Sequence, residues 1–368
     1  MRKRNKFFIS CAVLCAAGLL LSVLGWVFGG RFNGIGYQPG KGLTVFSANS
    51  YGNSENGPSV LTDTINDLEA FTSLDIKIDY ADISIQPSDH YGVEYQLVAW
   101  NPPVIQVKDG QLMVRDGKRN NSSPVMFLSG FNMTFSGSWP SAKEYVTVYV
   151  PADTYFTSLY VSTSSGATKI SGLQAKELTM VNDYGDVSLS DISCTNMDMK
   201  LSSGKFKAEN LNGESLKVSN DYGDCSLANS AITAVTDLSL SSGKLKISNS
   251  SLGRFSADSD YGDVDLNEIF ASDASLKLSS GNMTADAFLF SNLTVKSDYG
   301  YVDIAPASSE SYGYDLKTDY GEIKVADHKL GEVYYTFEKE YENWIRVECS
   351  SGDIIIRNMS LIHISEPT

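Results

Sequence analysis

Residues Asn220–Leu227 read NDYGDCSL, and near-copies occur at Asn182–Leu189 (NDYGDVSL) and Ser259–Leu266 (SDYGDVDL). Two aspartates bracket a Tyr-Gly pair in each copy. The motif is therefore either a carboxylate site, which binds a metal ion or a substrate, or the corner of a repeating fold. The sequence around it decides between the two.

The Tyr-Gly motif alternates along the chain with a second motif, Ser-Ser-Gly. Their glycines follow one another at intervals of 19, 20 or 21 residues, so that two motifs make a unit of about 38 residues. A last Ser-Ser-Gly follows at Gly352, after an aromatic and charged insertion. The predicted corner glycines are Gly166, Gly185, Gly204, Gly223, Gly243, Gly262, Gly281, Gly300 and Gly321.

Short alternating strands flank each glycine. Leu216 and Val218 precede Gly223, for example, and Cys225 and Leu227 follow it. A strand with one apolar face cannot bury that face alone, but stacked coils merge their faces into one core. The helical period is absent from this region. The sequence therefore predicts an all-β fold, a parallel β-solenoid with one coil per about 19 residues.

Stacking would place equivalent residues of neighbouring coils in columns, about 4.8 Å apart. In the column after the glycine the charges alternate, and opposite charges one coil apart attract. The residue before the glycine alternates between serine and tyrosine, which leaves room for each ring. The predicted charge ladder is Asp186, Lys205, Asp224, Lys244 and Asp263.

A calcium site is the first chemical alternative. Aspartates two coils apart would be separated by about 9.6 Å, whereas calcium ligands lie about 2.3–2.6 Å from the ion. A lysine would also stand between them. A structural corner is therefore favoured, and no cofactor is predicted. The remaining weak calcium candidates are Asp183, Asp186, Asp221, Asp224, Asp260 and Asp263.

Catalysis is the second alternative. Glycoside hydrolysis needs two carboxyl groups about 5–10 Å apart in a cleft, but an even ladder along a rod forms no cleft. A polysaccharide lyase on a β-helix is the stronger enzyme hypothesis, and it needs a basic residue among projecting loops. The sequence contains no zinc-protease, nucleophile-elbow, phosphate-loop or dinucleotide motif. We therefore predict no catalytic residue and no enzyme activity.

Two aromatic clusters lie outside the repeat. Phe127, Phe131, Phe135 and Trp139 form the first, and the second lies within the insertion at 327–344. They are interpreted as caps on the ends of the solenoid, which such folds require. A binding patch for a glycan or a protein is the alternative.

The N-terminus predicts a membrane anchor. Residues 1–6 carry four cations, and residues 7–30 carry no charge and are rich in Leu, Val and Ala. Such a segment is long enough to span a bilayer as a helix, and the cationic flank stays in the cytoplasm. A cleaved signal peptide is the alternative, but its apolar region is usually shorter. Both interpretations place the body outside the plasma membrane of a bacterium.

The rest of the chain divides by composition. Residues 31–70 are predicted to be a flexible stalk, 71–150 an N-terminal β region with a loop insertion, and 151–358 the solenoid. An Asp-Gly pair at 109–110 predicts a β-hairpin there. Residues 359–368 break all periodicity and are interpreted as translated adapter sequence.

The charge and cysteine content limit the partners. The chain has 44 acidic residues against 29 Lys plus Arg, a net charge of −15. Nucleic acid is therefore excluded as a partner, because the electrostatic interaction is repulsive. Cys194, Cys225 and Cys349 form no disulfide framework, and Cys225 is predicted to be a small buried apolar residue.

The segments LDIKIDYADISI (Leu74–Ile85) and YVTVYVP (Tyr145–Pro151), followed by the repeats, carry a family resemblance. The chain resembles the bacterial putative-adhesin family of β-strand-repeat, membrane-anchored proteins of unknown function. The resemblance implies an exported β-solenoid with a role in the cell envelope, and it supplies no catalytic residues. The predicted function is a non-catalytic surface scaffold or interaction module with a protein or glycan ligand. A lyase-like enzyme and an envelope-stress accessory protein that binds a membrane partner are the alternatives.

Overall fold

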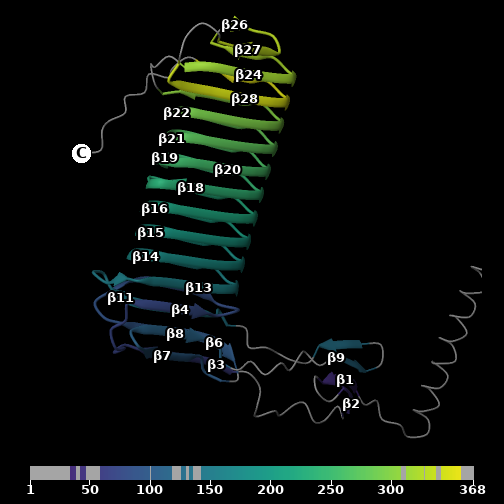
Figure 1. The fold of residues 1–368 in the computed structure, drawn as a ribbon. Helices are drawn as coiled ribbons and strands as arrows, with labels where there is room; N and C mark the ends of the chain where they lie inside the picture. The colour runs from purple at the N-terminus through teal and green to yellow at the C-terminus, as the bar shows by residue number, and fades with distance from the viewer. Residues whose placement is uncertain are drawn as a thin grey trace, which may run out of the picture. The chain divides into compact units, whose positions relative to one another are not determined.

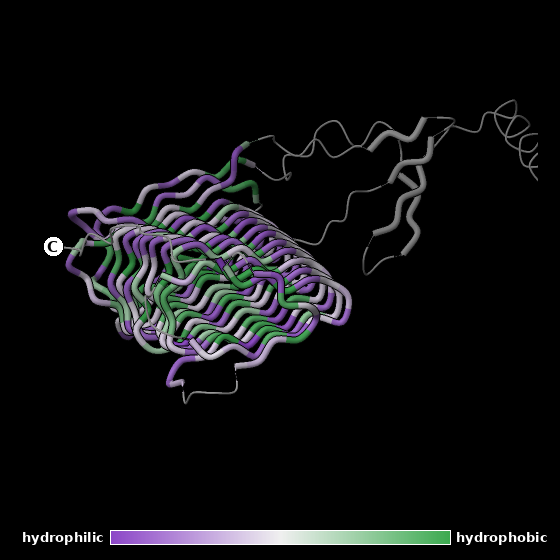
Figure 2. The backbone as a smooth tube through the Cα atoms, turned by 90° about the horizontal axis from the view of Figure 1, so that it is seen from above, coloured by the Kyte–Doolittle hydropathy of each residue, from purple (hydrophilic) through white to green (hydrophobic). Residues whose placement is uncertain are grey.

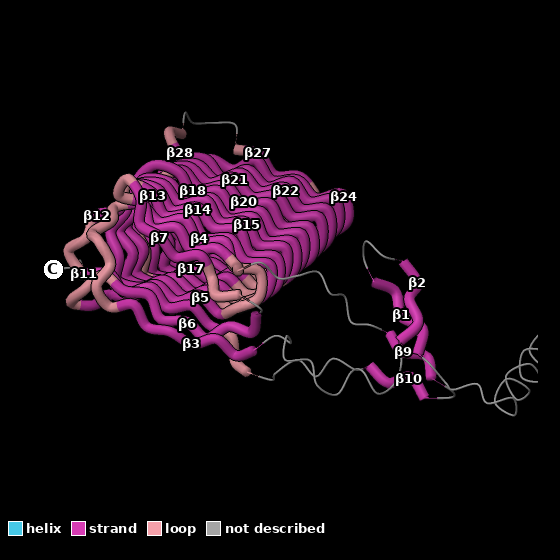
Figure 3. The backbone as a smooth tube through the Cα atoms, turned by 90° about the horizontal axis from the view of Figure 1, so that it is seen from below, coloured by secondary structure: helices cyan, strands magenta, loops and turns pink. Residues whose placement is uncertain are grey.

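The computed structural model describes residues 34–38, 42–46, 59–99, 101–117, 126–129, 132–135, 142–307, 312–326, 328–336 and 341–357. Every regular element in these ranges is a β-strand (Figure 3), so the all-β prediction is confirmed. The chain divides into two compact units. The smaller consists of Met1–Ser59, Val98–Asn101 and Lys118–Ser141, and the larger of Val60–Leu97, Pro102–Gly117 and Ala142–Thr368.

The smaller unit contains two antiparallel hairpins. One is formed by β1 (Gly34–Gln38) and β2 (Gly42–Phe46), and the other by β9 (Met126–Ser129) and β10 (Asn132–Phe135). The first lies in the range predicted to be a flexible stalk, so that prediction is corrected there. A Pro-Gly pair between two short apolar runs favours a turn, which the Gly- and Ser-rich composition of the range obscured.

The remaining strands form one 25-stranded sheet, which makes up most of the larger unit. They are β3 (Ser59–Ile65), β4 (Ser73–Lys77), β5 (Asp82–Ser88), β6 (Gly92–Ala99), β7 (Val104–Lys108), β8 (Gln111–Arg115), β11 (Tyr145–Pro151), β12 (Tyr155–Phe156), β13 (Ser158–Ser165), β14 (Thr168–Tyr184), β15 (Val187–Ser203), β16 (Phe206–Tyr222), β17 (Cys225–Ala228), β18 (Ala231–Ser242), β19 (Leu245–Ser251), β20 (Arg254–Tyr261), β21 (Val264–Ser280), β22 (Met283–Tyr299), β23 (Val302–Pro306), β24 (Tyr312–Tyr320), β25 (Ile323–Val325), β26 (His328–Lys329), β27 (Val333–Tyr335), β28 (Asn343–Ser351) and β29 (Ile354–Ile356).

The strands of the repeat stack coil on coil. β14 pairs with β15 and β15 with β16, all parallel, so that Leu178, Met197 and Leu216 stand in one column. The offset between these coils equals the sequence period. Figure 1 shows the resulting ladder from β13 up to β24.

The core runs along the inside of this stack. In β15 the inward positions Val187, Leu189, Ile192, Cys194 and Met197 are all buried. Because neighbouring coils repeat the pattern, apolar stripes continue from coil to coil (Figure 2). Burial against the neighbouring coils supplies the hydrophobic stabilisation that a single coil lacks.

The corner glycines are required by close backbone contact. From Gly166 to Gly300 all eight predicted glycines have φ between 125° and 151°, a region that L-residues with a side chain rarely adopt. A Cβ atom built on Gly223 would lie 2.0 Å from the carbonyl oxygen of Gly204 in the coil before. Gly321 makes the same close approach to the Gly352 carbonyl. Only glycine fits at these positions, because the carbonyl of a neighbouring corner lies against each of them.

A second corner, which the sequence did not predict, lies after the first strand of each coil. It is marked by a column of residues with φ near 50–65°, at a spacing of 19 or 20 residues. Asparagine and aspartate tolerate this conformation better than other side chains, and they occupy most of the column. Its members are Gly172, Asp191, Asn210, Asn229, Asn249, Glu268 and Ala287.

The coil order departs from the chain order at the C-terminal end. β28 pairs with β22 on one side and with β24 on the other, and β29 pairs with β23 and β25 in the same way. The last coil therefore fills a gap between two coils that precede it in the sequence. This explains why Gly300 and Gly321 both belong to Tyr-Gly motifs: Ser351 and Gly352 lie between them in space.

The stack also begins earlier than residue 151, the predicted boundary. β4 pairs in parallel with β13, β5 pairs in parallel with β14, and Tyr80 forms a bridge with Ser165. The segment Asp79–Asp82 is thus a corner of the same kind, with Ala81 in the place of glycine. The next coil in space lies 85 residues later in the chain, so neither the motif nor the period revealed this coil.

Antiparallel segments cover both ends of the parallel stack. β7 and β8 form the hairpin predicted from Asp109-Gly110, and β26 and β27 fold back antiparallel on β25 and β24. No helix in the described ranges is long and apolar enough to cross a membrane. The predicted transmembrane segment (7–30) and the aperiodic tail (359–368) lie outside the described residues.

Candidate binding edge at the glycine corners

Six exposed tyrosines line one edge of the stack, and we call them the tyrosine edge. They are Tyr80, Tyr184, Tyr222, Tyr261, Tyr299 and Tyr320, each between 53% and 80% exposed. A serine lies in register between each two of them, in the spatial order Tyr80, Ser165, Tyr184, Ser203, Tyr222, Ser242, Tyr261, Ser280, Tyr299, Ser351, Tyr320. Tyrosines therefore recur at every second coil, about 9.6 Å apart.

The tyrosine edge is acidic. An aspartate directly precedes each of the six tyrosines, and a carboxylate follows the glycine in most of these corners. These carboxylates lie at the surface beside the rings. The surface thus combines aromatic faces with hydrogen-bond acceptors of negative charge.

The carboxylates after the glycines hold the corners together. Asp186 accepts a hydrogen bond from the backbone N–H of Lys205 at 2.9 Å, and Asp263 accepts one from the N–H of Asn282 at 2.9 Å. Asp224 does the same for the N–H of Lys244 at 3.1 Å. Each aspartate thus satisfies a backbone donor of the next coil, which is a structural role.

The predicted charge ladder is only partly present. Lys205 Nζ lies 3.6 Å from the carboxylate of Asp224. Lys244, however, pairs with Asp265, and this hydrogen bond raises the pKa of Lys244. The closest ion pair of Lys244 thus lies outside the ladder, because a long lysine side chain reaches the next outward residue of the neighbouring strand, while Asp263 and Asp224 attract Lys244 more weakly. These exposed pairs contribute at most about 1 kcal/mol each.

Buried polar side chains support the corners from inside, and the sequence did not single them out. Asn220 Nδ2 donates to the carbonyl oxygens of Gly204 (3.0 Å) and Gly223 (3.1 Å), and Asn182 Nδ2 donates to Gly166 at 3.2 Å. Both amides are buried. The equivalent position carries leucine in Ser-Ser-Gly coils that lie between them. A polar residue at an inward position, three before the glycine, was the signal that could have found them.

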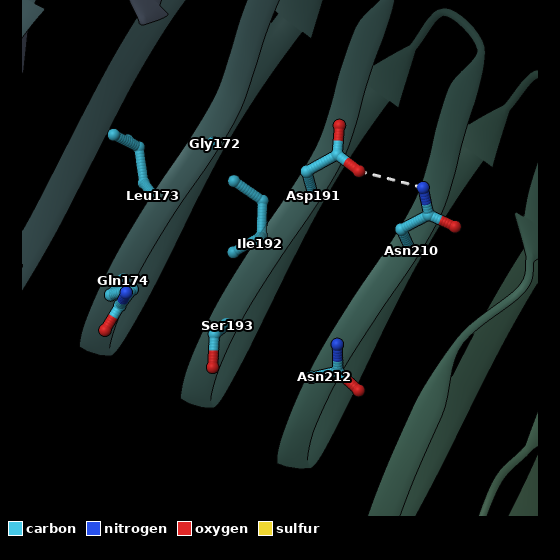
Figure 4. Close-up of a pocket in the computed structure, with 8 residues that line it drawn as sticks. All are labelled: Gly172, Leu173, Gln174, Asp191, Ile192, Ser193, Asn210 and Asn212. Carbon is cyan, nitrogen blue, oxygen red and sulfur yellow. Dashed lines mark hydrogen bonds between the residues drawn. The ribbon is translucent and has the colours of Figure 1, made fainter. Parts of the chain in front are cut away.

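The second corner carries a shallow hollow, drawn in Figure 4. It lies between Gly172, Asp191 and Asn210, and Asn210 Nδ2 donates to Asp191 Oδ1 at 2.8 Å. Asn249 and Asn229 pair likewise at 3.0 Å. These polar groups form hydrogen bonds with one another along the column. We therefore interpret the hollow as a consequence of the turn at the second corner and not as a binding site.

The calcium candidates do not come together. Among the described residues, no three His, Cys, Asp or Glu side chains are grouped so that they could hold a metal ion. Asp186, Asp224 and Asp263 each use one carboxylate oxygen on a backbone N–H. The absence of a cofactor stays a prediction.

Comparison with known families fits this geometry. The model of the Toastrack DUF4097 family matches residues 71–236 and 199–357, which is well over half of the chain. The chain belongs to the Toastrack DUF4097 family. The resemblance to β-strand-repeat proteins of unknown function is thereby confirmed.

Two solved structures of bacterial proteins align with most of the chain. A "putative adhesin" from Bacteroides fragilis is 12% identical, with a TM-score of 0.35, and the match covers 83% of this chain and 100% of that one. A "putative lipid binding protein" from Parabacteroides distasonis is 13% identical, with a TM-score of 0.33, and the match covers 83% and 98%. No curated protein matches the chain.

The three cysteines in the described part of this Toastrack chain, Cys194, Cys225 and Cys349, are buried. Burial raises the pKa of Cys225 to about 12 and that of Cys194 to about 11. A thiol that stays protonated is a poor nucleophile and a poor metal ligand. The geometry of Cys225 therefore fits its predicted role as a small apolar residue.

Proposed function

We propose that this protein is a non-catalytic, membrane-anchored interaction module of a bacterial envelope, with its β-body outside the cell. The observation that carries the proposal is the tyrosine edge. The exposed aromatic rings are evenly spaced along a stack of similar coils, and such a row is suited to contact with an extended partner. Exposed apolar groups rimmed by polar residues mark interaction surfaces.

The backbone of the corners supports a rigid surface. Gly223 N–H donates to the carbonyl of Ser242 at 2.9 Å, and Gly204 N–H donates to the carbonyl of Tyr222 at 2.9 Å. Each corner is thus fixed by its neighbours before any partner arrives. Preorganisation of this kind lowers the entropy lost on binding.

The N-terminal sequence supports the anchor. Four cations in residues 1–6 and the uncharged segment 7–30 are typical of a signal anchor with the cationic end in the cytoplasm.

The lyase alternative would need an available basic residue. A hollow near the C-terminal end of the stack contains three cations, Lys296, Lys317 and Arg346. Lys296 Nζ lies 3.6 Å from the Glu348 carboxylate, and Lys317 Nζ lies 3.1 Å from that of Asp319. Both ammonium groups are ion-paired, and the Arg346 guanidinium lies over the Trp344 ring, 4.9 Å from its centroid, so that each cation already has a structural partner.

Co-sedimentation of the full-length protein with purified envelope fractions tests the proposal. We expect saturable binding to cell-wall material, protease sensitivity of the β-body in intact cells, and no unsaturated product from polysaccharides. Crosslinking with the anchor intact separates a dedicated membrane partner from a wall ligand. Turnover that a single Asp or Lys substitution abolishes would replace the proposal with the enzyme alternative.

A further inference from the structure

The stack itself does not need tyrosine at the exposed corner position. Ser203 and Ser242 occupy the same position in the neighbouring coils, with the same glycine beside them. Tyr222, between them, is 65% exposed and therefore buries little of its ring against the stack. A tyrosine exposed singly needs no explanation, but six exposed tyrosines in one regular row form an extended apolar feature of the kind that marks an interaction surface.

The alternation is preserved where the chain order is not. Tyr80 belongs to a coil 85 residues before its spatial neighbour, and Ser351 is placed between Tyr299 and Tyr320 by the inserted last coil. Three separate chain segments thus contribute to one regular row. The row extends over five intervals of about 9.6 Å.

A peptide strand is a poor fit to this row. Adding a strand requires unpaired backbone groups at a sheet edge, but the corner N–H and C=O groups already pair from coil to coil. The row also runs across the strands, along the stacking direction. Only side chains are available to a partner that follows it.

The negative charge of the tyrosine edge limits which extended polymers can bind to it. The aspartates beside the rings, such as Asp183, Asp221 and Asp260, repel polyanions, and they accept hydrogen bonds from hydroxyl groups. Lys205 and Lys244, the two lysines of the intervening corners, each lie in an ion pair with an aspartate, and the aspartates of the edge outnumber them. An uncharged, hydroxyl-rich chain meets both conditions.

We propose that the tyrosine edge binds an uncharged, linear β-1,4-linked polysaccharide that lies along the stack, with every second sugar ring on a tyrosine. In such a chain equivalent sugar faces recur once per disaccharide, at about the spacing of the tyrosines. The C–H face of a sugar ring packs on an aromatic ring, and the flanking carboxylates accept from its hydroxyls. This inference rests on the proposed function and specifies its ligand class and its site.

Binding would accumulate along the row. Each ring contributes a weak contact, and a chain long enough to reach several rings gains affinity without new kinds of contact. Affinity should therefore rise with oligosaccharide length in steps of two sugars. A single deep site would instead saturate at one short length.

The test uses the full-length protein in a detergent without a sugar headgroup. Calorimetry with cello- and chito-oligosaccharides from disaccharide to octasaccharide measures the length dependence, and carboxymethylcellulose is the anionic counterpart. The double variant Tyr222→Ser/Tyr261→Ser installs the residue of the neighbouring coils. We expect its affinity for the octasaccharide to fall roughly tenfold, since two central contacts are lost. Tyr155→Ser, at a tyrosine that is also 53% exposed but lies off the edge, should bind as the wild type does.

The outcomes separate this inference from the proposed function. Stepwise affinity that is lost in the double variant, with an unchanged melting temperature, supports it. Equal binding by wild type and double variant would overturn it, as would binding of carboxymethylcellulose in preference to neutral chains. No glycan binding, with envelope co-sedimentation retained or a protein or second copy captured instead, would overturn the ligand and leave the proposed function standing.

Discussion

At the scale of single residues, the corner glycines combine two constraints that most turns impose separately. A left-handed φ alone disfavours a side chain by about 1–2 kcal/mol. At Gly223 the neighbouring Gly204 carbonyl, 2.0 Å from a Cβ position, adds a clash that only a backbone shift could relieve. Such a shift would also displace the neighbouring coils, because their strands are hydrogen-bonded in register with this one.

We therefore predict that Gly223→Ala lowers the free energy of unfolding by at least about 3 kcal/mol. Gly110→Ala is the matched control, because Gly110 also has positive φ (73°) but no atom lies within 4 Å of its Cβ position. It should lose only about 1 kcal/mol. Urea denaturation followed by circular dichroism measures both. Equal losses in the two variants would contradict the close-contact explanation.

Substitutions of Asn220 test the buried polar column. Asn220→Ser should be the mildest, since Ser259 occupies the equivalent position and donates to the Gly262 carbonyl at 3.4 Å. Asn220→Leu removes two donated hydrogen bonds and should cost about 1–3 kcal/mol. Asn220→Asp places a buried carboxylate against carbonyl oxygens and should be the worst at neutral pH. Thermal unfolding should rank them in that order, and a leucine variant more stable than the serine variant would exclude a role for the hydrogen bonds.

Alkaline pH tests the burial of Cys225. Its pKa in the fold is about 12 against an ordinary value of 9.0. The protonated thiol therefore stabilises the fold fully below pH 9, and this contribution is lost as pH rises from about 9 towards 12. Between neutral pH and about pH 10, wild type should lose about 1 kcal/mol more than Cys225→Val. Chemical denaturation at both pH values measures the difference, and parallel losses would mean that the thiol is accessible in the fold.

At the scale of elements, the regular coils could be predicted from the sequence because their glycines recur at a fixed interval. The hairpin at Asp109-Gly110 could be predicted because that pair suits the left-handed turn that joins two strands. The coil of β4 and β5 could not, since Ala81 replaces the glycine and its neighbour lies far along the chain. The second corner, whose residues have φ near 50–65°, could not be predicted because its residues vary from asparagine to glutamate and alanine. The exposed tyrosines were visible in the motif, but their unbroken alternation depends on a coil order that no local pattern encodes.

The inserted last coil makes a prediction about truncation. Deleting residues 341–368 would leave β22 and β24 without the partner that lies between them, and unpaired strand edges expose backbone groups and promote aggregation. We expect loss of cooperative unfolding or of soluble protein. Deleting only 359–368 keeps β28, β29 and the Arg357 guanidinium, which binds Asp286 and Asp303 at 2.5 Å. That variant should keep its melting temperature, and an equal defect in both would show that the tail, not the coil, is needed.

At the scale of the whole molecule, the repeat behaves as a unit of two coils rather than one. Tyrosine and serine alternate outside, asparagine or serine alternates with leucine inside, and glycine occupies both the Tyr-Gly and the Ser-Ser-Gly corners. In a stack of this kind each coil contacts only its neighbours, so stability is close to a sum of coil and interface contributions. We therefore infer that the alternation of the two coil types increases the stability of the interface between neighbouring coils.

Deletions of one and two coils separate this idea from a simple dependence on length. Removing residues 186–223 joins Gly185 to Asp224 and leaves Tyr184 beside Ser242, as in the natural order. Removing 186–204 deletes half as much chain but stacks Tyr184 on Tyr222 and Asn182 on Asn220. We predict that the shorter deletion is the more destabilising, by at least about 2 kcal/mol, because it places two buried amides, whose oxygens already lack a hydrogen-bond partner, on adjacent coils without Leu201 between them. Denaturant unfolding of both variants decides it: if stability simply follows the number of coils retained, then the two coil types are interchangeable, and their alternation serves only the exposed edge.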